Sequence, residues 1–183
     1  MENILNIKIN SVFKFILISL LGSILLVISA KIKIPFYPVP MTMQTFMVLF
    51  LGISFGYKIG LASVGLYLFE GIIGLPVFSN SPEKGIGLIY FTGPTMGYLI
   101  GFLFAVFSVG YFKYDKNLIQ IFLKLIFSVS FIYLIGVLWL TILIGSDKPI
   151  FKLGVQPFLL AEIFKLLILT AIYSKIKKIR NII

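Results

Sequence analysis

The chain has 183 residues, of which 60% are hydrophobic and 12% charged, and its formal net charge is +10. A soluble domain carries about 25% charged residues, so this composition excludes one and predicts an integral membrane protein. The chain has neither cysteine nor histidine, which excludes disulfides, thiolate or imidazole catalysis and Cys/His metal sites.

The apolar segments predict one membrane domain, 1–183, that is an all-α bundle of six transmembrane helices with ordered outer loops. The predicted spans are residues 11–30, 41–55, 59–73, 95–111, 125–144 and 157–173. Lys31 directly follows Ala30 and leaves no small-residue cleavage site, so we predict an uncleaved first span. A tight turn at 56–58 joins the two short spans on either side of it, which predicts a helical hairpin.

The first predicted span carries small residues at Ser19, Gly22 and Ser23. Small side chains at helical spacing let a second helix approach closely. The sequence leaves two interpretations open for them, which are packing inside the bundle and docking of a partner protein.

Residues 31–45 follow this span and contain three prolines, Pro35, Pro38 and Pro40, which exclude a regular helix. The polar residues Thr42, Gln44 and Thr45 come at the edge of the next apolar run. Irregular backbone at membrane depth is tolerated only where it is buried in protein or lines a cavity. We therefore predict that this segment forms one wall of a site.

Glu70 lies near the far end of the third predicted span. It is interpreted either as an interfacial acid, snorkelling or ion-paired, or as a ligand contact. Residues 71–98 are then rich in Gly, Pro, Ser and Asn, which predicts an ordered loop. Long loops of this kind are often functional, and glycine lets backbone approach a ligand closely.

The last predicted span carries an acid and a base, Glu162 and Lys165. Their spacing of three residues places both on one face of a helix. A charge inside a membrane is costly and usually faces a partner, a cavity or a ligand. We predict that the pair forms the floor of a small-molecule site, and the alternative is an ion pair that only locks the bundle.

The basic residues predict the topology. With six spans, one side of the membrane receives nine of them and the other side five. The nine are Lys8, Lys14, Lys58, Lys113, Lys116, Lys175, Lys177, Lys178 and Arg180, and the five are Lys31, Lys33, Lys84, Lys148 and Lys152. The positive-inside rule then places both termini in the cytoplasm and the site at the outer face. The positive charge suits membrane lipid, and the sequence has no nucleic-acid-binding motif.

The side chains near this predicted site suit a small amphipathic acid with an N–H-bearing ring. A lysine binds a carboxylate, a glutamate accepts N–H donors, and amides and hydroxyls do both. The candidate binding residues are Lys165, Glu162, Asn80, Gln44 and Thr42, with apolar walls from Phe36, Tyr37, Tyr90, Tyr98 and Phe158. We predict no catalytic residue, no metal ligand and no cofactor.

Three classes of function are open to a membrane protein of this kind: transport, catalysis and scaffolding. No G-x-x-x-x-G-K-[ST] motif is present, so active transport would need energy from another subunit. An integral membrane enzyme lacks a recognisable nucleophile, base or carboxylate pair. A scaffolding protein does not explain an intramembrane charge pair. The residues therefore favour small-molecule binding for transport.

Three segments, 34–45, 74–78 and 93–102, resemble the BioY family, the biotin-specific S components of energy-coupling factor (ECF) transporters. The resemblance implies a six-helix S component in a bacterial plasma membrane that binds biotin with high affinity at the outer face. It also implies a transmembrane T component and two ATPase subunits as partners, so that this chain is not itself an enzyme. An S component for another small vitamin is the alternative.

The last span departs from the family pattern, Pro-Phe-Leu-Pro-Gly-Asp with a lysine three residues on. Here Leu160 and Ala161 replace the second proline and the glycine, and Glu162 replaces the aspartate, whereas Lys165 is in place. The resemblance implies that Asn80 contacts the ureido group of biotin and that Lys165 lies near its carboxylate. The longer acid implies a slightly shifted site.

Overall fold

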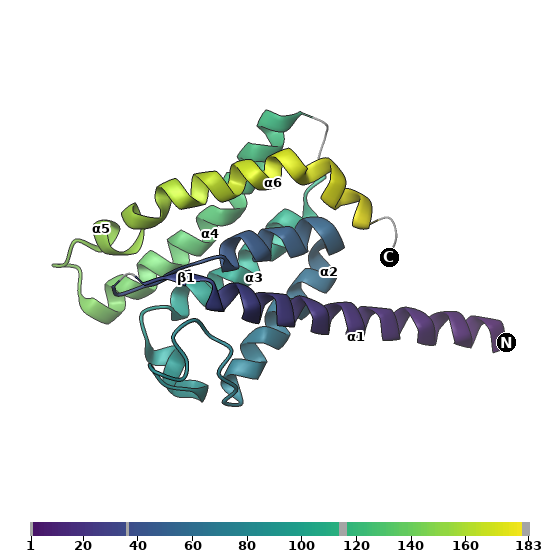
Figure 1. The fold of residues 1–183 in the computed structure, drawn as a ribbon, viewed down its shortest axis with the longest axis horizontal. Coiled ribbons are helices and arrows are strands. Elements are labelled where there is room, and N and C mark those ends of the chain that lie inside the picture. Colours follow the sequence, from purple (N-terminus) through teal and green to yellow (C-terminus); the bar gives the residue numbers. More distant parts are fainter. Residues whose placement is uncertain (1, 36, 114–116, 181–183) are drawn as a thin grey trace.

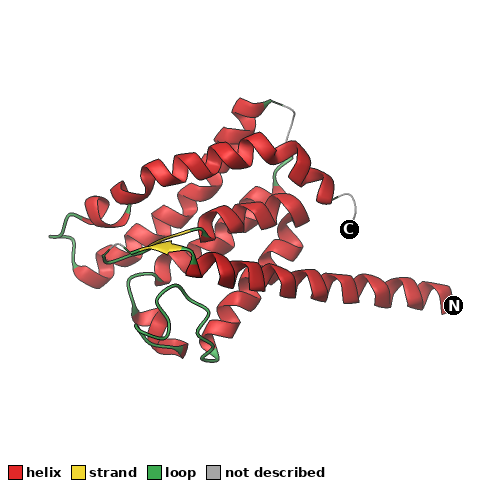
Figure 2. Ribbon diagram, in the orientation of Figure 1, coloured by secondary structure: helices red, strands yellow, loops and turns green. Residues whose placement is uncertain are grey.

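The computed structural model of the protein describes residues 2–35, 37–113 and 117–180, with side chains from Ser11 onward. The described chain forms six α-helices, two short 3-10 helices and one two-stranded sheet (Figures 1 and 2). The α-helices are α1 Glu2–Lys31, α2 Gln44–Ile72, α3 Met96–Tyr111, α4 Leu118–Ile144, α5 Ile150–Gly154 and α6 Leu159–Ile179. The strands are β1 Lys33–Ile34 and β2 Met41–Thr42, and the 3-10 helices are η1 Gly87–Thr92 and η2 Gln156–Phe158.

The long helices have the length and composition of membrane spans. Among the described residues, four apolar segments are long enough to cross a membrane, at Ser11–Lys31, Gln44–Ile72, Leu118–Ile144 and Ile150–Ile179. The helix α3 is also apolar but shorter. The predicted helical membrane architecture is confirmed at this level. Figure 1 shows α1 beginning and α6 ending at one end of the molecule, with β1 and α5 at the other.

The second helix bends sharply at Gly56, where the backbone leaves the helical region with φ 78° and ψ 174°. A methyl group added at Gly60 would lie 3.5 Å from Cα of Gly52. Eight residues of a straight helix would separate these positions by about 12 Å. The two arms of α2 therefore fold back on each other at the tight turn that the sequence predicts between the second and third spans.

The first helix packs closely on the second arm of α2 through its small residues. A methyl group added at Gly22 would lie 2.2 Å from Oγ of Ser63, so only glycine permits this approach. The hydroxyl of Ser23 donates a hydrogen bond of 2.6 Å to Oε2 of Glu70. Packing inside the bundle is thus the observed role of Gly22 and Ser23. Glu70 therefore accepts a hydrogen bond from α1 and does not line the cavity described below.

Two helices begin at other residues than the predicted spans do, and one predicted loop contains a helix. The fourth helix begins at Leu118, not near 125, because the side chain of Asn117 accepts hydrogen bonds from the amides of Ile119 and Gln120 and caps it. The last helix begins at Leu159, because Pro157 lies in the preceding 3-10 turn. The predicted loop between these helices contains α5. In the charged turn after α3, residues 114–116 lie outside the described residues.

The helical fold also includes one small β-hairpin. The strands β1 and β2 pair antiparallel, with Lys33 opposite Thr42 and Ile34 opposite Met41. The proline-rich residues between them turn the chain back, and prolines that exclude a helix are compatible with a turn of this kind. The hairpin leads directly into α2 and places Thr42 beside its first turn.

The contact between α3 and α4 gives a test of this packing. A methyl group added at Gly101 would lie 2.6 Å from Cα of Ile132 and 3.1 Å from the carbonyl oxygen of Phe131, and backbone atoms cannot easily move aside. We expect Gly101→Ala to lower stability by roughly 1–3 kcal/mol, measured by thermal unfolding in detergent. The control is Gly65→Ala, where a methyl group meets nothing within 4 Å. Equal melting temperatures for the two variants would contradict the close contact.

Candidate functional site

A cavity lies at the end of the bundle that carries the β-hairpin. It encloses about 560 Å³ of empty space, including the part open to solvent. Its polar lining residues are Thr42, Gln44, Thr45, Ser79, Tyr90, Thr95, Tyr98, Tyr133, Glu162 and Lys165. They come from the hairpin, the first turn of α2, the loop before α3, and the helices α3, α4 and α6, so the cavity is assembled from segments that are far apart in the sequence.

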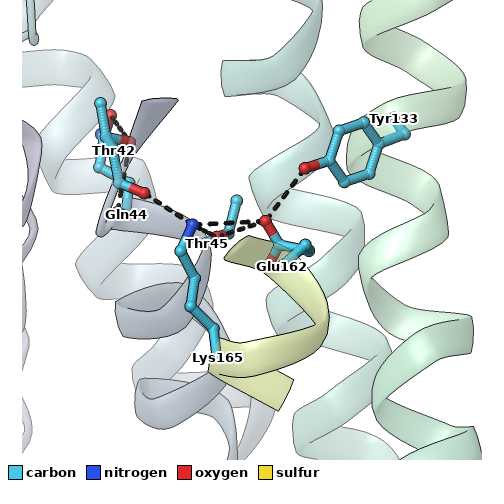
Figure 3. A network of polar contacts seen from close by, with 6 residues as sticks. All are labelled: Thr42, Gln44, Thr45, Tyr133, Glu162 and Lys165. Atoms are coloured by element: carbon cyan, nitrogen blue, oxygen red, sulfur yellow. Dashed lines mark hydrogen bonds and ion pairs between the residues drawn. The ribbon is translucent and has the colours of Figure 1, made fainter. Parts of the chain in front are cut away.

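The acid and base of α6 form a buried ion pair in this cavity (Figure 3). The distance from Nζ of Lys165 to Oε2 of Glu162 is 3.4 Å, and the two residues are only 6% and 4% exposed. The lysine also donates to the main-chain oxygen of Thr42 at 2.8 Å and to Oγ1 of Thr45 at 2.9 Å. An ammonium group has three N–H donors, so the protein supplies an acceptor for each of them.

The carboxylate of Glu162 uses its two oxygens unequally. Oε2 accepts hydrogen bonds from Oγ1 of Thr45 and from the hydroxyl of Tyr133, each at 3.0 Å, as well as from Lys165. Oε1 is buried and has no hydrogen-bond partner among the described residues. A buried carboxylate oxygen without a donor is costly. The protein therefore leaves one hydrogen-bonding position of this carboxylate unused.

A second polar strip lies beside the pair, at the start of α2. The side chain of Gln44 donates from Nε2 to the hydroxyl of Tyr67 at 2.7 Å, and its Oε1 accepts from Oγ1 of Thr42 at 3.2 Å. Gln44 and Tyr67 are both buried. Because these bonds hold the amide in one orientation, Gln44 and Thr42 present fixed polar groups to the cavity.

Aromatic rings provide much of the apolar wall. The rings of Phe78 and Tyr90 stack with their centroids 4.5 Å apart, and both line the cavity. Tyr98 of α3 lies edge-on to Tyr133 of α4 at 6.3 Å, and its hydroxyl donates to the carbonyl of Gly154 at 2.9 Å. Its hydroxyl is thus used within the protein, and this bond also fixes α5 against α3.

Seven of the ten residues predicted for the site line this one cavity, namely Lys165, Glu162, Gln44, Thr42, Tyr98, Tyr90 and Phe158. Tyr37 does not line it and is exposed. Asn80 does not line it, because its Oδ1 accepts a hydrogen bond of 3.1 Å from Lys33. Phe36 lies outside the described residues. Tyr133 was not among the predicted residues, and its signal in the sequence is a phenol within a long apolar span.

The apolar helices and the buried charge pair inside a cavity define a multi-pass membrane protein with a small-molecule site. The model of the BioY family matches residues 3–181, so the chain belongs to the BioY family. The resemblance seen in the sequence is thereby confirmed.

Relatives with sequence similarity are named as transporters. A probable biotin transporter of Pyrococcus horikoshii is 36% identical over 75% of this chain and 80% of its own length. A biotin transporter of Thermotoga maritima is 34% identical over 85% of this chain and 90% of its own length. A crystal structure of the S component for biotin from an ECF-type ABC transporter superposes with a TM-score of 0.76 at 27% identity. That match covers 92% of this chain and 93% of the solved chain.

Proposed function

We propose that this chain is the biotin-binding S component of an ECF-type vitamin transporter and that the cavity is its biotin site. The observation that carries the proposal is the buried Glu162–Lys165 pair with an unpartnered Oε1, in residues that line this cavity. Family membership and the names of the relatives supply the ligand class.

The geometry supports a specific arrangement of the ligand. Biotin carries a ureido ring with two N–H groups, and Oε1 of Glu162 is an acceptor without a donor, so we place the ureido ring there. The three donors of Lys165 already have acceptors. The carboxylate of biotin would reach this lysine only by replacing one of them, and the 3.4 Å contact with Glu162 is the longest. Asn80 would reach the ureido group only after leaving Lys33.

Membrane placement follows from the same proposal. Residues 1–183 would form one domain that crosses a bacterial plasma membrane six times, with the two arms of α2 as separate crossings. Both termini would be cytoplasmic and the cavity would open outward, because the positive-inside rule assigns the side with the larger set of basic residues to the cytoplasm. The apolar side chains exposed along α1, such as Phe13, Leu17 and Ile24, suit contact with lipid.

Transport would need partner subunits. The sequence carries no phosphate-binding loop motif that would hold ATP. We therefore propose that a transmembrane T component and two ATPase subunits energise transport, and that this chain contributes substrate capture and no catalysis of its own. The relationship to an S component of an ECF-type transporter supports this division of labour.

The experiment that tests the ligand is calorimetry on the purified chain in detergent. We expect saturable heat with biotin at micromolar concentration and none with thiamine, riboflavin or folate. Biotin methylated on a ureido nitrogen should bind more weakly, because it loses an N–H donor to Glu162. The methyl ester of biotin tests whether the carboxylate of the ligand contributes to binding. Absence of heat with biotin itself would refute the proposed ligand.

A variant with a smaller expected effect tests the hydrogen bond from Tyr133 to Glu162. Tyr133→Phe removes the hydroxyl that donates to Oε2 of Glu162 at 3.0 Å and keeps the ring that packs beside Phe158. We expect biotin affinity to fall roughly ten-fold, the usual loss for one hydrogen bond to a charged group. Tyr111→Phe, at an exposed position of α3, is the matched control. Equal affinities for the two variants would remove Tyr133 from the site.

A further inference from the structure

One lysine at the end of α1 holds a loop that is distant in the sequence. Nζ of Lys31 donates to the main-chain oxygens of Pro76 at 2.8 Å, Phe78 at 2.8 Å and Ser81 at 3.0 Å. These three bonds engage every N–H donor of the ammonium group. Residues 76–81 therefore wrap around a single cation, and we call this segment the clamped loop.

A second lysine reinforces the same loop. Nζ of Lys33, at the start of β1, donates to the main-chain oxygen of Ser79 and to Oδ1 of Asn80. Neither Lys31 nor Lys33 forms an ion pair with any described residue. Hydrogen bonds from a cation to a carbonyl are stronger than neutral ones, so these contacts fix the backbone of the loop more firmly than a neutral side chain would.

The clamped loop supplies part of the cavity wall. Phe78 and Ser79 line the cavity, and Phe78 is 1% exposed. The ring of Phe78 stacks on Tyr90 and lies edge-on to Tyr67 at 5.3 Å. A methyl group added at Gly71 would lie 2.0 Å from this ring, so the ring packs against α2 at a place where glycine leaves room for it. The position of this wall thus depends on where the backbone of the loop is held.

We propose that Lys31 is a positioning residue for ligand retention: by clamping residues 76–81 it holds Phe78 and Ser79 against the cavity and slows the escape of bound biotin. The inference rests on the proposed function for its ligand. It assigns a role in binding to a lysine that does not line the cavity itself. The proposed role of Lys31 thus differs from that of Lys165, which lines the cavity.

The test combines two measurements on the full chain in detergent. Hydrogen exchange without ligand reports the mobility of residues 75–85, and the dissociation rate of labelled biotin reports retention. In Lys31→Met we expect exchange in this segment to rise selectively. We expect dissociation to accelerate roughly ten-fold, as for the loss of charged hydrogen bonds, with an unchanged number of binding sites per chain. Lys31→Arg keeps a cation with several donors and should recover most of the slow dissociation.

The matched control is Lys148→Met, which removes the same charge from an exposed lysine that forms an ion pair with Asp147. Unchanged loop exchange in Lys31→Met would overturn the clamp. Increased exchange with unaltered biotin dissociation, or an arginine variant no better than methionine, would overturn the positioning role. Absence of biotin binding by the unmodified chain would instead refute the proposed ligand, and loop exchange would then decide the clamp alone.

Discussion

Replacing Lys165 by methionine is expected to reduce biotin affinity at least about a hundred-fold. Methionine matches the lysine in length but donates no hydrogen bond, so Thr42, Thr45 and Glu162 each lose a partner. Removing one member of a buried ion pair typically costs about 3–5 kcal/mol, because it leaves an uncompensated charge. A ~2.7 kcal/mol share of that cost appearing in binding corresponds to the hundred-fold loss.

The control for this variant lies on the same helix. Lys175→Met removes an equal charge from an exposed position of α6, far along the helix from the cavity. Calorimetry of both variants with biotin, beside thermal unfolding of each, separates loss of binding from loss of fold. Wild-type affinity in Lys165→Met would assign the ion pair to the bundle alone and remove the main support for the site.

The central pair was predictable because its geometry is local. Glu162 and Lys165 are three residues apart on one helix, and helical periodicity alone places them on one face. Thr42 and Gln44 were predictable for a related reason. Polar groups that follow a proline-rich, non-helical segment at membrane depth need either protein or a cavity around them. In both cases a rule that acts over a few residues was sufficient.

The partners of the pair were not predictable, because they depend on how distant helices meet. Tyr133 reaches Glu162 from α4, 29 residues earlier in the chain, and Thr45 reaches it from α2, 117 residues earlier. Asn80 is the reverse case, because it was predicted to contact the ligand but does not line the cavity. Its side chain lies in a polar loop, but Lys33 from β1 takes its oxygen and holds it outside the cavity lining. Hydropathy and spacing carry no information about such long-range choices.

For the helices, too, some features were predictable from the sequence and others were not. Hydropathy located the apolar segments, because burial in lipid or protein acts on whole segments. Helix ends instead depended on single residues, as the cap at Asn117 shows. The bend in α2 was visible in the sequence because glycine tolerates a positive φ at no steric cost. In the structure Gly56 adopts a φ of 78° at this bend.

The second large effect is expected when both charges are removed together. The double variant Glu162→Leu with Lys165→Met should bind no measurable biotin, since both the acceptor and its counter-ion are gone. Its thermal stability should nevertheless match or exceed that of Lys165→Met alone. Replacement of a buried ion pair by apolar residues of similar size is often neutral or stabilising by about 1–4 kcal/mol.

This comparison separates the two interpretations of the pair. If Glu162 and Lys165 only lock the bundle, the single and double variants should keep biotin affinity wherever the fold survives. If the pair serves the ligand, the double variant should recover stability without recovering affinity, because no apolar pair supplies the acceptor at Oε1 of Glu162. A double variant that folds and binds biotin like the unmodified chain would overturn the proposed site. Recovery of the fold alone would show that the charges are retained for binding, at a cost to stability.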